Sequence, residues 1–208
     1  MPILQRSVHK MRRAHVTLWF APLILGVLTA SYWLVAFWAA VNAPIRKRPS
    51  EEYPWEPIGG YIPEGEASLE QYLQVMNASN IDGAVLVQPT PYGWDNSYLL
   101  ACKHSDAEKL KAVVLVNPLD ENAPGILKKL VEDGADGLRI NLHLQPVERW
   151  RTEHFNKLWQ NCAQIKLPVC LQMTPAYLNF VMELVQTYYT KIIIDHLGRP
   201  AKGADPAD

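Results

Sequence analysis

Side chains capable of acid–base and anion-binding chemistry follow the last apolar run of the sequence. Asp195, His196 and Arg199 come directly after the isoleucines at residues 192–194. A neutral imidazole can bind a metal ion or move a proton. A planar guanidinium binds a carboxylate through two parallel hydrogen bonds and polarises a carbonyl. We therefore treat this stretch as the first candidate for a site.

Earlier apolar runs end in polar side chains as well, and these are Gln88, Asn117, Arg139, Asn141, His143 and Gln172. The carboxyl ends of parallel barrel strands share one edge, where barrel enzymes place their active sites. The alternative stays open, because a histidine after a buried strand is often structural. Asp195 could likewise only brace a loop.

The elements that would position these residues alternate between strand and helix. Strands are expected at residues 83–89, 112–118, 136–143, 168–175 and 191–198, and helices at 68–76, 96–103, 124–132, 153–165 and 176–189. The strands are almost continuously apolar, as in parallel sheets covered on both faces. An open doubly wound sheet and a barrel both fit. No glycine-rich phosphate loop follows a strand, and the polar strand ends favour the barrel.

A long apolar segment precedes this region. Residues 17–41 carry no Asp, Glu, Lys or Arg, and ~20 apolar residues suffice to span a bilayer as a helix. The expected plan is a basic tail at 1–16, a transmembrane-type helix at 17–41, a lead-in at 42–66 and a barrel at 67–208. Basic residues on both sides leave the orientation of a single-pass membrane protein undetermined. The alternatives are a buried helix of a soluble cytoplasmic protein, or unintended coding sequence.

Composition excludes several classes of protein. The chain has 208 residues and a net charge of −1, so nothing indicates a nucleic-acid surface. Its three cysteines show no CxxC spacing, which argues against a disulfide framework and against a structural zinc site.

Three motifs resemble the amidohydrolase-related family, in particular its lactone hydrolases of the 2-pyrone-4,6-dicarboxylate lactonase type. They are VLVQPTPYGWDNSYLL at residues 85–100, GADGLRINLH at 134–143 and IIIDHLGRP at 192–200, and YPWEP at 53–57 adds to them. The resemblance covers about residues 53–200. It implies a TIM-type (β/α) barrel and hydrolysis of a small cyclic ester or amide that carries carboxylates.

The resemblance also implies roles for individual residues. His196 and Asp195 become candidate catalytic residues, with His196 also a candidate metal ligand. Arg139, Arg199 and Asn141 become candidate substrate-binding residues. A divalent metal such as zinc is a family cofactor, but Gln172 stands where metal-binding relatives often carry a histidine, so a full ligand set is not expected.

Two departures from the family pattern qualify this expectation. The family begins with an Asp-x-His-x-His strand, and the nearest match here places His15 at the first histidine, Thr17 at the second and Arg13 at the aspartate. The family's last two strands, and the family aspartate that activates water, have no counterpart in the sequence up to Asp208. We therefore expect a partial barrel.

Three functions stay open on these grounds. The first is a hydrolase acting on a small lactone or amide, with a small-molecule substrate. The second is a catalytically inactive, truncated and membrane-tethered remnant of the family. The third is a membrane-bound interaction module, which no pattern in the sequence supports.

Overall fold

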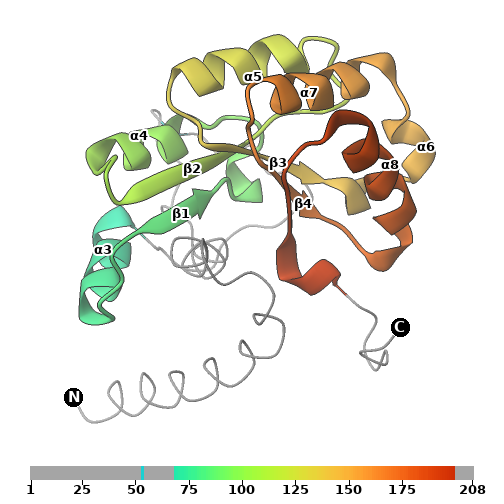
Figure 1. Cartoon of the computed structure of the whole chain (residues 1–208). Helices are drawn as coiled ribbons and strands as arrows, with labels where there is room; N and C mark the ends of the chain where they lie inside the picture. Colours follow the sequence, from blue (N-terminus) through green and yellow to red (C-terminus); the bar gives the residue numbers. More distant parts are fainter. Residues whose placement is uncertain (1–52, 54–67, 200–208) are drawn as a thin grey trace. The chain divides into compact units, whose positions relative to one another are not determined.

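The computed structural model describes Tyr53 and residues 68–199, and its centre is a curved sheet of five parallel strands (Figure 1). The strands are β1 (Ala84–Val87), β2 (Leu110–Leu115), β3 (Gly137–Asn141), β4 (Val169–Gln172) and β5 (Ile192–Ile194). They lie side by side in the order of the sequence. This sequential order is that of a (β/α) barrel, whereas a doubly wound sheet reverses its order at a switch point. The described residues thus form a half-barrel, as predicted.

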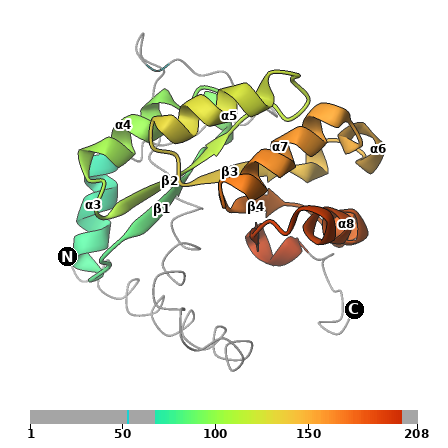
Figure 2. The same ribbon diagram turned by 45° about the horizontal axis from the view of Figure 1, so that its top comes forward.

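Helices connect the strands and cover one face of the sheet (Figure 2). They are α3 (Leu69–Ala78), α4 (Ser97–Ser105), α5 (Ala123–Glu132), α6 (Val147–Trp150), α7 (Glu153–Gln164) and α8 (Leu178–Tyr188). Ser68 caps α3 in a capping box with Gln71, and the Thr152 hydroxyl accepts the amide of Phe155 to cap α7. The predicted apolar stripe of α7 is buried, with Phe155 and Trp159 among its members.

The two faces of the sheet have different partners. Residues such as Leu86, Val114 and Leu138 pack with the helices into the main core. Full burial of each such side chain stabilises the fold by about 1.5–3 kcal/mol. The opposite face carries a smaller cluster that includes Val113 and Cys170. Because successive side chains of a strand alternate between faces, this second face also carries Arg139.

All five strands end earlier than the sequence predicted, and the difference moves candidate site residues in the last three. β3 ends at Asn141, and His143 lies in a short 3-10 helix, η3 (Leu142–Leu144). β4 stops at Gln172. β5 stops at Ile194, and Asp195 begins another 3-10 turn, η5 (Asp195–Gly198). His196 and Leu197 have positive φ angles of 52° and 56°, and a chain in that conformation cannot continue an extended ladder.

The predicted transmembrane-type helix at 17–41 lies outside the described residues, as does His15. Among the described residues, no helix has both the length and the apolar character needed to cross a bilayer.

Candidate active site at the carboxyl edge of the sheet

The register of β3, β4 and β5 aligns polar residues on the face of the sheet turned away from the core. Arg139 pairs with Cys170, and Cys170 pairs with Ile193. One step further along, Asn141 pairs with Gln172. Residues paired in a parallel register point to the same side. The side chains of Arg139, Asn141 and Gln172 therefore lie on one face of the sheet, near its carboxyl edge.

A buried ion pair organises this edge. An Nη2 of Arg139 lies 3.2 Å from Oδ2 of Asp195, and both side chains are almost fully buried. The Nε–H of Arg139 donates to Oδ1 of Asn141 over 2.9 Å. The thiol of Cys170 donates to Oδ1 of Asp195, also over 2.9 Å. Arg139 keeps further N–H groups beyond these two contacts, because a guanidinium carries five.

The charges of this edge act on two nearby histidines, His143 and His196. Burial lowers the pKa of His143, and the positive charges of Arg199 and Arg139 lower it further, against a backbone hydrogen bond to Gln172 that raises it. Burial is also the main cause that lowers the pKa of His196, and Asp195 opposes it. Both imidazoles are therefore held toward their neutral form.

The hydrogen bond of His143 fixes its tautomer. Nδ1 lies 3.2 Å from the carbonyl oxygen of Gln172. A carbonyl can only accept, so Nδ1 carries the proton and Nε2 keeps its lone pair. His143 thus offers a basic nitrogen near the ion pair, although its sequence position gave it less weight than His196.

Arg199 is the exposed cation of this edge. It has a left-handed φ of 47° and forms no ion pair with the described residues. Its charge nevertheless acts on both His143 and His196. A guanidinium without a protein counter-ion beside two neutral imidazoles can receive an anionic group of a small molecule.

The predicted site residues fall into two sets. The structure brings Arg139, Asn141 and Asp195 into direct contact, with His196 and Arg199 within electrostatic reach. Two other polar residues at strand ends, Gln88 and Asn117, instead form hydrogen bonds with the backbone of the loop that follows each of them. Gln88 donates to the carbonyl oxygen of Asp95 over 2.6 Å, and Asn117 accepts the amide of Leu119 over 3.1 Å.

Cys170 is the member of this network that the sequence reasoning missed. It looked like one more apolar residue of a buried strand. The signal that could have found it is its position two residues before Gln172, which places both on one face of β4.

The described residues do not form a metal centre. No group of three His, Cys, Asp or Glu side chains among them could hold a metal ion. Both oxygens of Asp195 already face Cys170 and Arg139. The part of the site that the structure describes therefore does not fit the zinc ion that the resemblance implied, and we derive no step through a metal.

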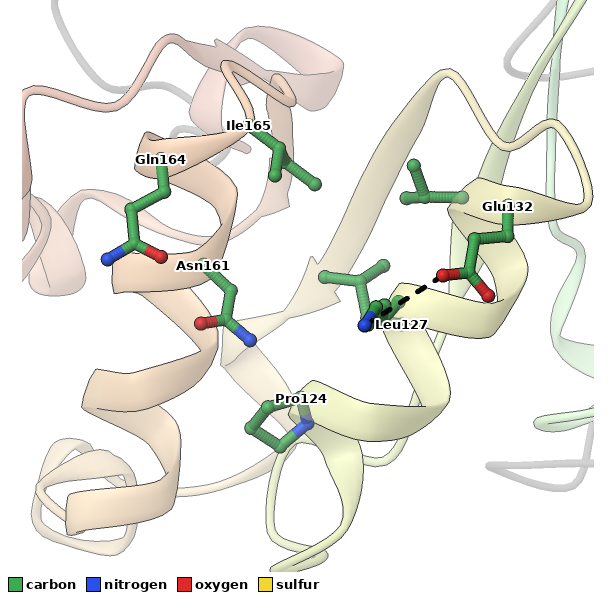
Figure 3. Close-up of a pocket in the computed structure, with 8 residues that line it drawn as sticks. Pro124, Leu127, Glu132, Asn161, Gln164 and Ile165 are labelled. Atoms are coloured by element: carbon green, nitrogen blue, oxygen red, sulfur yellow. Dashed lines mark ion pairs between the residues drawn. The ribbon is translucent and has the colours of Figure 1, made fainter.

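A groove of about 350 Å³ lies elsewhere, between α5 and α7 (Figure 3). Its lining includes Leu127, Val131 and Ile165, with Lys128 and Glu132 paired at 3.9 Å beside them. It opens on the outer helices and contains no nucleophile or imidazole, so we assign it no chemistry.

The half-barrel and its polar carboxyl edge place the chain in the (β/α)-barrel class. Residues 13–208 match the sequence model of the amidohydrolase family, and the chain belongs to this family. The match includes the apolar segment and the lead-in, and so extends further toward the N-terminus than the motifs indicated.

Two curated relatives are named as hydrolases of a lactone. A 4-sulfomuconolactone hydrolase from Hydrogenophaga intermedia is 28% identical over 163 residues, which is 77% of this chain and 53% of the relative. A protein of the same name from Rhizobium radiobacter is 28% identical and covers 73% and 50%. The chain thus spans about half the length of these curated relatives.

Solved structures show the same fold. A probable 2-pyrone-4,6-dicarboxylic acid hydrolase from Acinetobacter baumannii, with citric acid bound, aligns with a TM-score of 0.64 at 23% identity, over 76% of this chain and 58% of that one. A second protein named for this activity, from Pseudomonas putida, gives 0.59 at 30% identity, over 68% and 51%.

Proposed function

We propose that this chain is a hydrolase acting on a small cyclic ester, a lactone, that carries a carboxylate or a similar anionic group. The observation that carries the proposal is the gathering of Arg139, Arg199 and two neutral histidines at the carboxyl edge of a barrel sheet. The names of the relatives, sulfomuconolactone hydrolase and pyrone dicarboxylic acid hydrolase, support it.

The site residues divide the work as follows. Arg199 binds an anionic substituent of the lactone, and the remaining N–H groups of Arg139 bind a second substituent or polarise the ester carbonyl. Water adds to the carbonyl carbon, the ring C–O bond breaks, and the departing oxygen takes a proton from the imidazolium that the attack has formed. A neutral imidazole of His196 or His143 accepts the proton that water loses.

Asp195 has a supporting role in this proposal. Its two oxygens are already engaged, Oδ1 by the thiol of Cys170 and Oδ2 by the ion pair with Arg139. We therefore assign Asp195 to holding Arg139 in place. Asn141, expected from the resemblance as a substrate-binding residue, is assigned here to orienting Arg139 through its 2.9 Å contact with Nε.

The alternative is a chain of the same family without catalytic activity. What favours it is that the described residues contain no unpaired buried carboxylate at this edge and no group of metal ligands. A family aspartate that activates water has no counterpart among them.

The deciding experiment measures ring opening of 4-sulfomuconolactone and 2-pyrone-4,6-dicarboxylate by ultraviolet absorbance, with and without a chelator. We expect turnover that His196→Ala reduces by roughly a hundredfold, the usual size of an acid–base contribution. Arg199→Ala should raise KM, because the anionic substituent of the lactone loses its guanidinium partner. His104→Ala and Lys129→Ala are matched controls, because both side chains are exposed and lie in the last turns of α4 and α5, which lead back to the amino ends of the strands. Wild-type turnover no higher than that of the His143→Ala, His196→Ala double variant would establish the inactive alternative.

A further inference from the structure

Cys170 occupies the centre of the polar network, on the strand between the two charged partners. It pairs in register with Arg139 of β3 on one side and with Ile193 of β5 on the other. The side chain is buried and contacts the small apolar cluster with Val87 and Val113. Its thiol points at Asp195, which follows β5.

The contacts of Asp195 show what the thiol contributes. Oδ1 accepts the S–H of Cys170, and Oδ2 faces Arg139. The thiol is therefore the hydrogen-bond donor to this carboxylate, whereas Oδ2 is held by the ion pair and forms no hydrogen bond with the described residues. A carboxylate held at only one oxygen can rotate about its terminal bond, a torsion with broad minima. The thiol removes that freedom, and the guanidinium on the other oxygen is fixed in turn.

We propose that Cys170 is a positioning residue, whose thiol orients Asp195 and through it sets the direction in which Arg139 presents its free N–H groups to an anionic substrate. The link to substrate rests on the proposed function, whereas the link from Cys170 to Arg139 rests on geometry alone.

The chemistry of the thiol suits this role. Burial, with the negative charge of Asp195, raises the pKa of Cys170 far above its usual range. The sulfur therefore keeps its proton through the neutral range and can only act as donor to the carboxylate. A thiolate at this position would repel Asp195.

Two variants separate positioning from simple packing. Cys170→Ser keeps a donor but introduces a more polar group into the apolar cluster. Cys170→Val fills a similar volume, suits that cluster, and cannot donate. A packing role predicts that the valine variant resembles the wild type and the serine variant does not. A positioning role predicts the opposite. The serine variant should then resemble the wild type in the exchange of the Arg139 Nε–H and in KM, and the valine variant should not.

The first measurement needs no substrate. Solvent exchange of the Arg139 Nε–H, which donates to Asn141, is followed by nitrogen–proton correlation spectra of the full chain. We expect the valine variant to exchange roughly tenfold faster or more, the factor for losing one hydrogen bond to a charged group. The serine variant should stay within about threefold of wild type. Equal exchange in wild type and the valine variant overturns the proposal, as does the reverse order.

The second measurement links the network to function. With a lactone that the wild type hydrolyses, we expect Cys170→Val to raise KM more than it lowers kcat. Cys170→Ser should leave KM near the wild-type value. If the wild type hydrolyses neither lactone, the proposed function fails, while the exchange measurement still decides the role of Cys170. An unchanged KM in the valine variant overturns the link to substrate binding.

Discussion

The guanidinium of Arg139 on β3 lies 3.2 Å from the carboxylate of Asp195, which directly follows β5, and β3 and β5 are not neighbours in the sheet. β4 runs between β3 and β5 and supplies Cys170 to the same carboxylate. Since both charged side chains are almost fully removed from solvent, each depends on the other for compensation. The ion pair is consequently a feature of stability as well as of the site.

Removing one member of this pair should destabilise the protein strongly. We expect Asp195→Ala to lower the free energy of unfolding by about 3–5 kcal/mol, because Arg139 is left buried and uncompensated. Urea denaturation measures this loss. Glu153→Ala is the control, since its ion pair with Lys157 is exposed and should contribute nothing measurable.

A double variant tests whether the uncompensated charge is the cause. Arg139→Met combined with Asp195→Ala should recover much of the lost stability, because no charge then remains buried. If the double variant is less stable than Asp195→Ala alone, the stated cause is wrong.

The two histidines should titrate at unusually low pH. We expect pKa values below the ordinary 6.5 for His143 and His196, because burial and the nearby guanidinium groups disfavour the charged imidazole. Between the lowered pKa of the folded state and the ordinary pKa of the unfolded state, the unfolded chain binds more protons. The contribution of the two histidines to stability is therefore complete above the ordinary pKa. It is lost as pH falls through the lowered pKa of the folded state. Proton-detected NMR titration measures both values. Arg199→Gln should raise them, whereas Arg149→Gln, an exposed change, should leave them alone.

Asn96 should be essential for anchoring the loop after β1. Its amide nitrogen donates to the carbonyl oxygen of Leu115 and its amide oxygen accepts the Leu115 N–H, both over 2.8 Å. Asn96→Ala leaves both backbone groups unpaired in the interior, and we expect a loss of about 2–4 kcal/mol by chemical denaturation. Asn122→Ala, at an exposed helix start without a side-chain cap, should change stability by less than about 0.5 kcal/mol. Similar losses for the two variants would contradict the assigned anchor.

Trp150 should control the loop that carries His143. Its indole Nε1–H donates to the carbonyl oxygens of Leu142 and Gln145, at 3.0 and 3.1 Å. Trp150→Phe keeps an aromatic ring but loses this donor, and we expect a cost of about 1–3 kcal/mol with faster amide exchange at residues 142–145. Trp94→Phe is the exposed control. Unchanged exchange in the loop would show that the indole does not anchor it.

None of the three cysteines should react in the native protein. All are buried, and burial raises the pKa of Cys162 to about 12 and that of Cys170 still further. Thiolate is the reactive form, so iodoacetamide at pH 8 should label no cysteine until the chain is denatured. Mass spectrometry counts the labels. Rapid native labelling of Cys170 would show that its thiol is not held against Asp195.

The sequence predicted the number and type of the strands well, because a parallel strand covered on both faces is apolar at nearly every position. It placed the strand ends less well. β5 was expected to continue through His196, but the left-handed backbone from His196 to Arg199 stops it at Ile194. No glycine or proline marks this turn at His196 or Leu197, so no local pattern in the sequence indicated it.

By itself, the sequence determined that this chain forms parallel βαβ units of the amidohydrolase type, with Arg139, Asn141, Asp195, His196 and Arg199 at the strand ends. Apolar runs and motif order are local properties, so the residues alone could show them. Only the tertiary structure decided the partners: Asp195 with Arg139, His143 with Gln172, and Cys170 as a donor rather than a packing residue. These contacts depend on the register between strands that are distant in sequence, and that register is fixed only when the sheet packs.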